Sequence, residues 1–581
     1  MAKWYVKNLK EDIAGISKET GIHPILVRLM LNRKIPEDKM NDFLKPTLEN
    51  SSHDPFLMKD MDKALDLLIK HIDAGSSILI VGDYDQDGNS ATMTLLDGLM
   101  LYTDNISYAI PNRLTDGYGI SMSIIEKAKE GGAGLIITCD NGISAFEEIE
   151  KIKELGMDVI ITDHHQVPEE GELQVVPQAD AVLNPQQWDC NYPFKELCGA
   201  GVAFKFIQGL YTKLDGDMDY LSDLLEYVCM GTVCDIVDLV DENRYIVIEG
   251  LKKINSTENY GMKSLIKETG IKGDVSVYSL GFIMGPCINA AGRLDTASKG
   301  IELFYEENME KVEEIAKELV SLNNERKDLT EIGYERVKES VLRLEKLPEI
   351  LVLKDEEIHE SIVGIIAGRI KEFFSRPTIL FTKAQEEGVL KGSGRSIEQY
   401  NMFEEINPYR ETLVSFGGHA MAAGMSISED NFEEFSRVLN ESSKLKEEDF
   451  QPKIYLDSSL NIEMLNFDLV DEIEKLSPFG KGNSRPLFGD KKILLKKLDV
   501  IGKNKNVLRF SLEKKGKLFT GISFRDTEET LDYLAEKFGP EGLEKIRLGL
   551  DHNYRIDICY YPQINEFNQK KTLQLHIKDL R

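Results

Sequence analysis

Three aspartates follow an apolar run at every second position. In the stretch SILIVGDYDQDG, residues 77–88, they are Asp83, Asp85 and Asp87. A single carboxylate would serve to cap the helix that follows. Three of them repel one another unless a cation neutralises their charge, and clustered carboxylate oxygens suit Mg²⁺ or Mn²⁺. The spacing therefore favours a metal site over a simple helix cap.

Three later segments carry side chains of the same chemistry. Asp140 lies in TCDNG, His164 and His165 lie in TDHHQVP, and Asp235 lies in MGTVCDIVDL. Asp140 or Asp235 alone would pass as a helix cap. Two adjacent histidines can place one imidazole at the metals and leave the other for a second metal or for proton transfer. We expect the four segments to end four strands and to hold two divalent ions, an arrangement that supports phosphoester hydrolysis.

The elements around these residues predict a parallel sheet. SSILIVGD, GLIITCD and DVIITD are short runs rich in Ile and Val, and each ends in an aspartate. MDKALDLLIKHI and ATMTLLDGLMLY have the spacing of helices that cover such a sheet. Functional groups of α/β sheets gather at the carboxyl ends of the strands, where these aspartates fall.

The rest of the chain predicts further domains. We expect an N-terminal helical segment at residues 1–55 and the parallel-sheet domain at 56–305. A long charged run at 306–345 predicts a connecting helix. It leads to a second α/β domain at 346–450, and short strands at 451–581 predict a small β-barrel.

Composition excludes several classes of protein. No window approaches 18 uninterrupted apolar residues and the N-terminus lacks the apolar core of a signal peptide, so we expect no membrane association. Seven cysteines without a C-x-x-C pair favour a reducing compartment, and we expect the cytoplasm. The net charge of −30 disfavours a nonspecific coat on duplex DNA, although a local basic groove suffices for phosphate contacts. The chain has no Walker A pattern and no G-x-G-x-x-G after a strand, which argues against an NTPase or a dinucleotide oxidoreductase.

The motifs together resemble a known family. DYDQDG, TCDNG, TDHH and the aspartate of GTVCDIVDL occur in the order typical of the DHH phosphoesterase superfamily. LKGSGRS and SFGGHAMAAG resemble the DHH-associated substrate-binding domain, and LSPFGKGNSRPLF resembles the opening of an OB domain. The whole arrangement is similar to that of the RecJ family of single-stranded-DNA-specific 5′→3′ exonucleases over nearly the full chain.

The resemblance implies a role for each metal-site residue. Asp85, Asp87, Asp140, His164 and Asp235 would ligate two Mn²⁺ or Mg²⁺ ions. His165 would complete the second site or act as an acid, so His164, His165 and Asp140 are the predicted catalytic residues. Asp83 would be a further ligand or would orient a neighbour. Many DHH phosphoesterases carry a histidine where this chain has Val81, so we expect a weaker or water-filled first site.

The resemblance also implies a substrate site. Arg113, otherwise a surface arginine, would hold the 5′-terminal phosphate with Ser393 and Arg395, because Arg offers a planar fork of donors. The other residues predicted at the phosphate or the DNA backbone are Arg293, His359, Arg369, Gly394, Gly417, Gly418 and His419. GGHAMAAG would be a loop that approaches the backbone closely, or else a tight helix N-terminus that favours an anion. Relatives often read GPRINAAGR where this chain reads GPCINAAGR, so Cys287 is expected to remove one backbone contact.

The family's activity is the function that the resemblance implies. The chain would release 5′-mononucleotides from single-stranded DNA by two-metal hydrolysis, in DNA repair and recombination, and its OB domain would track the strand by stacking. One alternative is a phosphodiesterase for short oligoribonucleotides or cyclic dinucleotides. Another is an inactive single-strand-binding scaffold. We expect a monomer, with a single-strand binding protein or a helicase as candidate partners.

Overall fold

The computed structural model describes residues 2–113, 116–502, 504–567 and 570–581. The chain forms two compact units, one of residues 47–450 and one in which residues 1–46 join residues 451–581. Each unit is described by itself. Among the described residues, no helix is both long enough and apolar enough to cross a bilayer.

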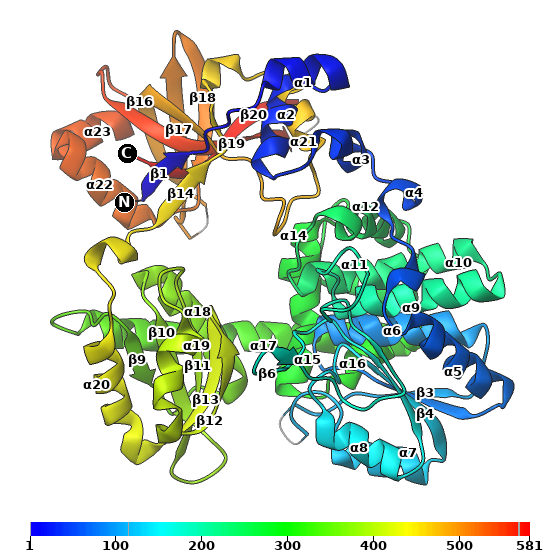
Figure 1. The fold of residues 1–581 in the computed structure, drawn as a ribbon. Helices are drawn as coiled ribbons and strands as arrows, with labels where there is room; N and C mark the ends of the chain where they lie inside the picture. Colours follow the sequence, from blue (N-terminus) through cyan, green and yellow to red (C-terminus); the bar gives the residue numbers. More distant parts are fainter. Residues whose placement is uncertain (1, 114–115, 503, 568–569) are drawn as a thin grey trace. The chain divides into compact units, whose positions relative to one another are not determined.

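The unit of residues 47–450 begins with a five-stranded parallel sheet (Figure 1). Its strand order is β3-β2-β4-β5-β8. The strands are β2 (Ser77–Val81), β3 (Ile106–Ala109), β4 (Ala133–Cys139), β5 (Asp158–Thr162) and β8 (Ala181–Leu183). All four pairings are parallel, which confirms the predicted sheet.

Helices cover both faces of this sheet. One apolar core joins Ile78 and Ile80 of β2 to α5 (Met61–Asp73), α6 (Gln86–Met100) and α9 (Gly199–Leu214). The other joins Val81 to α7 (Met122–Glu130) and α8 (Phe146–Glu154). Because neighbouring side chains of a strand point to opposite faces, β2 is buried on both sides. Its carboxyl end is thereby fixed.

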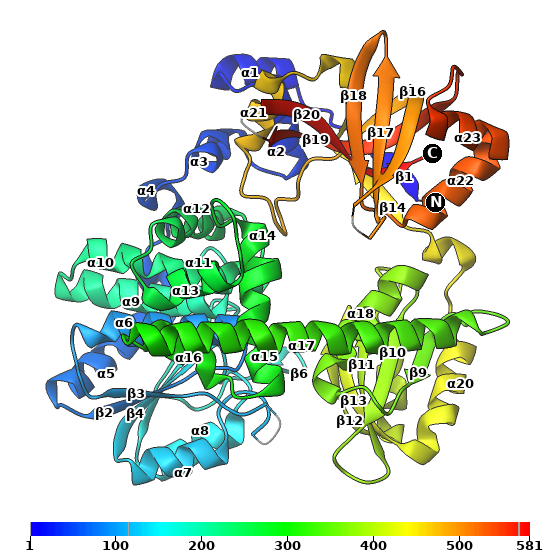
Figure 2. The ribbon, with the colours of Figure 1, turned by 180° about the vertical axis from the view of Figure 1, so that it is seen from behind.

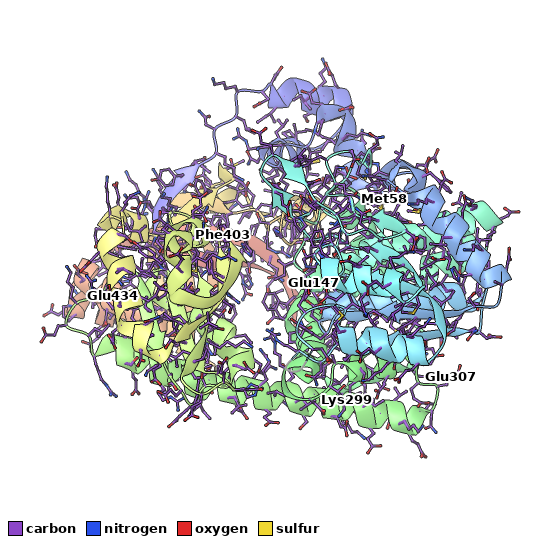
Figure 3. All side chains as sticks on the ribbon, turned by 60° about the horizontal axis from the view of Figure 1, so that its bottom comes forward. Met58, Glu147, Lys299, Glu307, Phe403 and Glu434 are labelled. Atoms are coloured by element: carbon purple, nitrogen blue, oxygen red, sulfur yellow. The ribbon has the colours of Figure 1, made fainter. Side chains whose placement is uncertain are left out.

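A helical region follows the sheet. It contains α11 (Leu225–Cys234), α12 (Asp241–Asn255), α13 (Tyr260–Glu268), α15 (Gly285–Leu294) and α16 (Ser298–Tyr305). The predicted connecting helix is α17 (Met309–Leu342), which runs on to the second sheet of the unit (Figure 2). Lys299 of α16 pairs with Glu318 of α17 at 2.8 Å and is labelled beside this helix in Figure 3.

The second sheet has the strand order β12-β13-β11-β10-β9. Its strands are β9 (Leu351–Lys354), β10 (Thr378–Lys383), β11 (Val389–Arg395), β12 (Leu413–His419) and β13 (Ala422–Ser428). Only β9 and β10 pair in parallel. Helix α18 (Val363–Phe374) packs on one face with α17, and α19 (Met402–Ile406) and α20 (Phe432–Ser442) pack on the other. The prediction of a second α/β domain is confirmed.

The other unit contains a closed five-stranded barrel. Its strands are β16 (Phe488–Ile501), β17 (Val507–Lys514), β18 (Lys517–Ser523), β19 (Arg555–Phe567) and β20 (Lys570–Leu580). They pair in the order β16-β17-β18-β20-β19, and β19 pairs back with β16 to close the ring. Two helices, α22 (Thr527–Phe538) and α23 (Pro540–Leu548), separate β18 from β19. The predicted OB-like barrel is confirmed.

The N-terminal segment is not wholly helical. It contains α1 (Ile13–Thr20) and α2 (Pro24–Asn32), but β1 (Lys3–Val6) precedes them and pairs in parallel with β14 (Lys453–Leu456). Trp4, Tyr5 and Val6 favour a strand once a partner is present. That partner lies hundreds of residues away in the chain, so the local sequence did not reveal it.

Candidate active site

The first aspartates of the predicted site lie at the carboxyl edge of the parallel sheet. Asp83 follows β2 and is 2% exposed, and Asp140 follows β4 and is 3% exposed. Asp140 has a φ of 60°, an unfavourable backbone angle for a non-glycine residue. Its backbone N–H donates to Thr162 O at 3.0 Å, and this bond ties it to the end of β5.

Two helix N-termini hold the next carboxylates. Asp85 is the N-cap of α6, and its Oδ1 accepts from Asp87 N at 2.9 Å and Gly88 N at 3.1 Å. Asp87 accepts from the first amides of α9, Gly199 N at 2.7 Å and Ala200 N at 3.0 Å. Helix N-termini favour negative charge. The amides at the starts of α6 and α9 therefore help to hold the negative charges of Asp85 and Asp87, which lie only two residues apart in the sequence.

Asp235 corrects one prediction. It does not end a strand but forms the C-cap of helix α11. This helix is apolar on almost every side, and the length of a short buried run does not tell a strand from a helix. His164 Nε2 still lies 3.8 Å from Asp235 Oδ2, so the residue reaches the same cluster as the strand-end aspartates.

The two histidines are oriented differently. His164 Nε2 lies 3.0 Å from Asp140 Oδ1 and 3.8 Å from Asp87 Oδ2. His165 is held at Nδ1 by the buried carboxylate of Asp163, 2.8 Å away. The hydroxyl of Tyr118 lies 3.2 Å from the ring nitrogens of His165 and donates to Asp140 O at 2.8 Å.

Asp163 and Tyr118 were not among the predicted site residues. Asp163 also accepts from the amides of Ile143, His164 and His165, at 2.7 to 3.1 Å, so most of its hydrogen-bonding capacity is used within this corner of the fold. The sequence signals for Asp163 were its place at the end of the strand DVIITD and directly before the two histidines. Carboxylates that orient metal-ligating histidines are common.

Three overlapping triads of potential ligand atoms result. They are Asp83–Asp85–Asp140, Asp87–His164–Asp235 and Asp140–His164–His165, each with its atoms within 4.8 Å of one another. All seven residues are the predicted metal-site residues. The oxygen Asp83 Oδ1 is buried without a hydrogen-bond partner. Orphaned buried carboxylate oxygens are costly, and the oxygen and imidazole donors fit Mg²⁺ or Mn²⁺. The residues present therefore fit a divalent metal centre.

The electrostatics of the cluster agree with this chemistry. Burial and the charge of Asp85 raise the pKa of Asp83 to about 8. Burial and the charges of Asp87 and Asp85 raise the pKa of Asp140 well above its usual range. Burial lowers the pKa of His164, which favours the neutral ring that ligates metals. A bound cation would favour the ionised carboxylates and so offset the effect of burial and mutual repulsion on their pKa values.

Val81 does not face this cluster. Its side chain is fully buried in the apolar core that β2 shares with α7 and α8. Its carbonyl accepts from Asn141 Nδ2 at 3.0 Å. The buried carboxylate of Asp83, two residues later, lies beside Asp85 and Asp140 instead.

Three arginines lie near one another, and one of them, Arg293, is close enough to Asp85 to feel its charge. The Arg113 guanidinium stands over the ring of Tyr84, with its carbon 5.1 Å from the ring centroid. Burial, followed by the charges of Arg113 and Arg326, lowers the pKa of Arg293 to about 10. Like charges gathered in this way favour an anionic ligand. Arg326 belongs to the connecting helix α17. It was not predicted as a site residue because it lies in a run of many charged residues.

Cys287 is a buried residue of α15. Its side chain is 1% exposed, and its thiol donates to Ile283 O at 3.1 Å and accepts from Asn323 Nδ2 at 3.3 Å. Burial raises its pKa. The amide oxygen of Asn323 accepts from Arg326 at 2.9 Å, so a basic side chain from α17 stands close to position 287.

In the second domain, the predicted phosphate residues gather at the start of α18. Arg395 Nη1 donates to Ser393 Oγ at 2.9 Å and to Gly394 O at 2.7 Å. A side chain at Gly364, in the first turn of α18, would lie 2.6 Å from Arg395 Nη2. Burial lowers the pKa of Arg395.

Arg293 links this group to the metal-bearing domain. Its Nη1 donates to Ser361 O just before α18. His359 lies 2.7 Å from the Ser361 hydroxyl and accepts from the Ser361 amide as the N-cap of this turn. The hydrogen bonds therefore join Arg293 of α15 to the turn that directly precedes α18.

Other predicted substrate residues are placed differently. Arg369 pairs with Glu331 at 2.7 Å and lies 3.9 Å from the Tyr334 ring, both on α17. Gly417, Gly418 and His419 end β12 in a hairpin with β13. The alternative of a helix N-terminus was therefore wrong.

The tip of this hairpin is exposed and rigidly held. A side chain at Gly418 would meet Ala422 O at 2.5 Å, whereas one at Gly417 would meet nothing within 4 Å. Phe403, labelled in Figure 3, stacks on Phe416 at 5.4 Å and fixes the strand beneath the tip.

Family models match most of the chain. A model described as the DHH family N-terminal domain matches residues 77–232, the DHHA1 domain matches 347–444, and the RecJ OB domain matches 456–579. A parallel sheet with carboxylates and imidazoles at its carboxyl edge, matched by the first model, defines a metal-dependent phosphoesterase of the DHH class. The curated relatives narrow this class. The chain belongs to the RecJ family of single-stranded-DNA-specific exonucleases.

The relatives match nearly the whole chain. RecJ of Bacillus subtilis (strain 168) is 33% identical over 99% of this chain and 70% of its own length. RecJ of Haemophilus influenzae is 34% identical, over 98% of each chain. The crystal structure of Thermus thermophilus RecJ in complex with Mn²⁺ has a TM-score of 0.82 at 25% identity, covering 100% of this chain and 79% of its own. A second, in complex with Mg²⁺, has a TM-score of 0.76 at 23% identity, covering 100% and 78%.

Proposed function

We propose that this protein degrades single-stranded DNA from its 5′ end and releases 5′-mononucleotides, in DNA repair and recombination. The observation that carries the proposal is the set of three ligand triads, which share Asp140 and His164 and so suit two adjacent divalent ions. Two such ions activate a water and stabilise the attacking and leaving oxygens of a phosphodiester.

The chain's own residues position the reacting groups. The amides at the start of α9 hold Asp87, and the strained backbone of Asp140 turns its carboxylate toward His164. Asp163 and Tyr118 fix the ring of His165 from two sides. His165 can thereby complete the second metal site or pass a proton to the leaving oxygen.

The arginines support recognition of a terminal phosphate. Arg113 and Arg293 lie beside the metal cluster, and Ser393 and Arg395 lie at the N-terminus of α18. Guanidinium groups and helix N-termini are both ready-made phosphate ligands. An enzyme that anchors a 5′-phosphate next to its metals cuts near that end, which supports the proposed polarity.

The barrel unit supports a single-stranded substrate. Phe524, 68% exposed, lies 6.1 Å from His576, and His576 stacks on Tyr561 at 4.8 Å. The Arg485 guanidinium then lies 5.4 Å from Tyr561 and 4.4 Å from Phe479. Such a row of rings and cations can stack unpaired bases without regard to sequence.

We also propose a cytoplasmic monomer that meets a single-strand binding protein or a helicase on DNA. All seven cysteines are unpaired, as a reducing compartment requires.

The decisive experiment uses end-labelled oligodeoxynucleotides with Mn²⁺. A 5′-phosphorylated oligonucleotide of about 30 residues should yield labelled mononucleotide from the first time point, and Asp140→Ala should lower the rate by about 10³-fold or more while binding stays measurable. A dinucleotide offered in competition identifies the alternative activity. Preference for that dinucleotide, or release of label from the 3′ end first, would overturn the proposal.

A further inference from the structure

Two aromatic side chains of the metal-bearing domain are exposed without packing against its core. Tyr278 is 65% exposed and Phe282 is 68% exposed. Their rings stack on each other with centroids 5.1 Å apart and planes 22° apart. Side chains as open as these add little to folding. In a stacked pair each ring covers one face of the other, and the outer faces are left open to stack on a planar ligand.

The helix beneath the rings is firmly anchored. Residues 277–294 form one continuous run, from α14 (Val277–Ser279) through a π-helical turn (Leu280–Met284) into α15. Leu280 O accepts from the thiol of Cys234 at 3.7 Å. A side chain at Gly285 would lie 2.3 Å from Cys234 Sγ, so the two helices touch there. Cys234 directly precedes Asp235, and π-helical turns are frequent at functional sites.

The same helix reaches the metal cluster at its other end. Asn289 Oδ1 accepts from Gln86 N at 2.7 Å, between Asp85 and Asp87. A side chain at Gly292 would lie 2.6 Å from Tyr84 O, and Arg293 follows. After Phe282, positions 286, 289 and 293 are partly exposed and follow one another at three or four residues, the spacing of one side of a helix, and positions 283, 292 and 294 are partly exposed as well.

The distance along the helix fits a nucleic-acid strand. At about 1.5 Å per residue, Phe282 lies roughly 10 Å and Tyr278 roughly 16 Å from Asn289 along the axis. Stacked nucleotides rise about 3.4 Å each, so these spans equal roughly three to five nucleotides. A strand whose end is held at the arginines and metals would pass the two rings a few nucleotides later.

We propose that Tyr278 and Phe282 form a base-stacking platform for the DNA strand, roughly three to five nucleotides to the 3′ side of the bond that is cut. This inference rests on the proposed function, whose substrate it places on a particular helix. The occupant is a nucleobase because the rings are apolar, present open faces and stand on the helix whose other end contacts the metal cluster. Every base has a flat face that can stack on an aromatic side chain, so this binding does not depend on the DNA sequence.

The first test compares substrate lengths. In Tyr278→Leu/Phe282→Leu, which keeps apolar surface but removes both rings, kcat/KM for a 5′-phosphorylated dT10 should fall about tenfold or more. The value for 5′-phosphorylated dT2 should stay within about twofold of the wild type. Tyr260→Leu, which removes another exposed ring of this unit, is the matched control and should change neither value. Equal losses on dT2 and dT10, or no loss on dT10, would overturn the platform.

The second test measures binding without turnover. In the Asp140→Ala background, a 5′-phosphorylated oligonucleotide of about ten residues carries one abasic site at successive positions, and Kd is measured for each. An abasic site at the third to fifth position should weaken binding several-fold, and the leucine double variant should lose this sensitivity. A flat profile, or a profile unchanged by the variant, would overturn the inference. The proposed exonuclease activity is tested by a different outcome: it would be refuted if the wild-type protein left single-stranded DNA intact.

Discussion

The carboxylate of Asp163 lies 2.8 Å from Nδ1 of His165 and accepts from three backbone amides of the same corner. The residue directly before the two histidines therefore holds the His165 ring and the backbone around it, and it is not part of the three ligand triads among the described residues. Its negative charge holds Nδ1 and so sets the orientation of the imidazole ring beside Asp140, whose Oδ1 lies 3.9 Å from the same nitrogen.

We expect Asp163→Asn to lower kcat on single-stranded DNA by about 10- to 100-fold and to raise the Mn²⁺ concentration needed for half-maximal rate. The amide oxygen can still accept from the backbone, so the fold should persist. Kinetics over a Mn²⁺ titration measure both effects. Asp189→Asn, at an exposed pair with Lys59, is the control. An unchanged Mn²⁺ requirement would show that Asp163 does not orient the site.

The absence of a side chain at Gly199 makes room for Asp140. A Cβ atom at position 199 would lie 2.5 Å from Asp140 Cβ, while the Gly199 amide holds Asp87. Gly199→Ala should therefore displace a metal ligand and reduce turnover about tenfold or more, with weaker Mn²⁺ binding by calorimetry. Gly201→Ala, two residues along the same helix, would meet only the Leu197 side chain, no closer than 3.2 Å, and should retain activity. Equal activities of the two variants would contradict this steric interpretation.

Much of the site followed from the sequence because its residues sit in local patterns. Aspartates after Val- and Ile-rich runs predicted the parallel strands and their shared edge, and β2, β4 and β5 end there. Asp235 was placed on a strand because an apolar run as short as that of α11 carries no helical period of its own. Tyr118 and Arg326 went unrecognised because their contacts are with residues distant in the sequence, whereas Asp163 bonds mainly to the next two residues and was passed over in favour of the histidines beside it. Strand β1 was missed for the same reason, since β14 lies far along the chain.

The phosphate site predicts a dependence on the 5′ end. Arg395 is held by Ser393 and Gly394 at the first turn of α18. Arg395→Ala should raise KM for a 5′-phosphorylated strand about 10- to 100-fold, with a smaller effect on a 5′-hydroxyl strand, because a charge-assisted bidentate contact is lost. Steady-state kinetics on both substrates give the comparison. Arg437→Ala, exposed on α20 of the same domain, is the control. The same change in KM for both ends would argue against a phosphate contact.

Glu226 predicts a pH dependence of stability away from the active site. Burial raises its pKa from 4.5 to about 7, although Thr257 donates to its carboxylate at 2.6 Å. The folded chain thus binds this proton more tightly than the unfolded chain. Its contribution to the free energy of unfolding is complete below pH 4.5 and is lost as the pH rises through about 7.

Glu226→Gln removes the titration and keeps an acceptor for Thr257. At pH 8 the variant should be more stable than the wild type, by up to about 3 kcal/mol, and near pH 4.5 the two should be nearly equal. Calorimetric Tm values at both pH values measure the difference. Glu307→Gln, at an exposed glutamate labelled in Figure 3, should follow the wild type at both. A stability gain of the same size at both pH values would show that packing, and not the buried charge, governs this position.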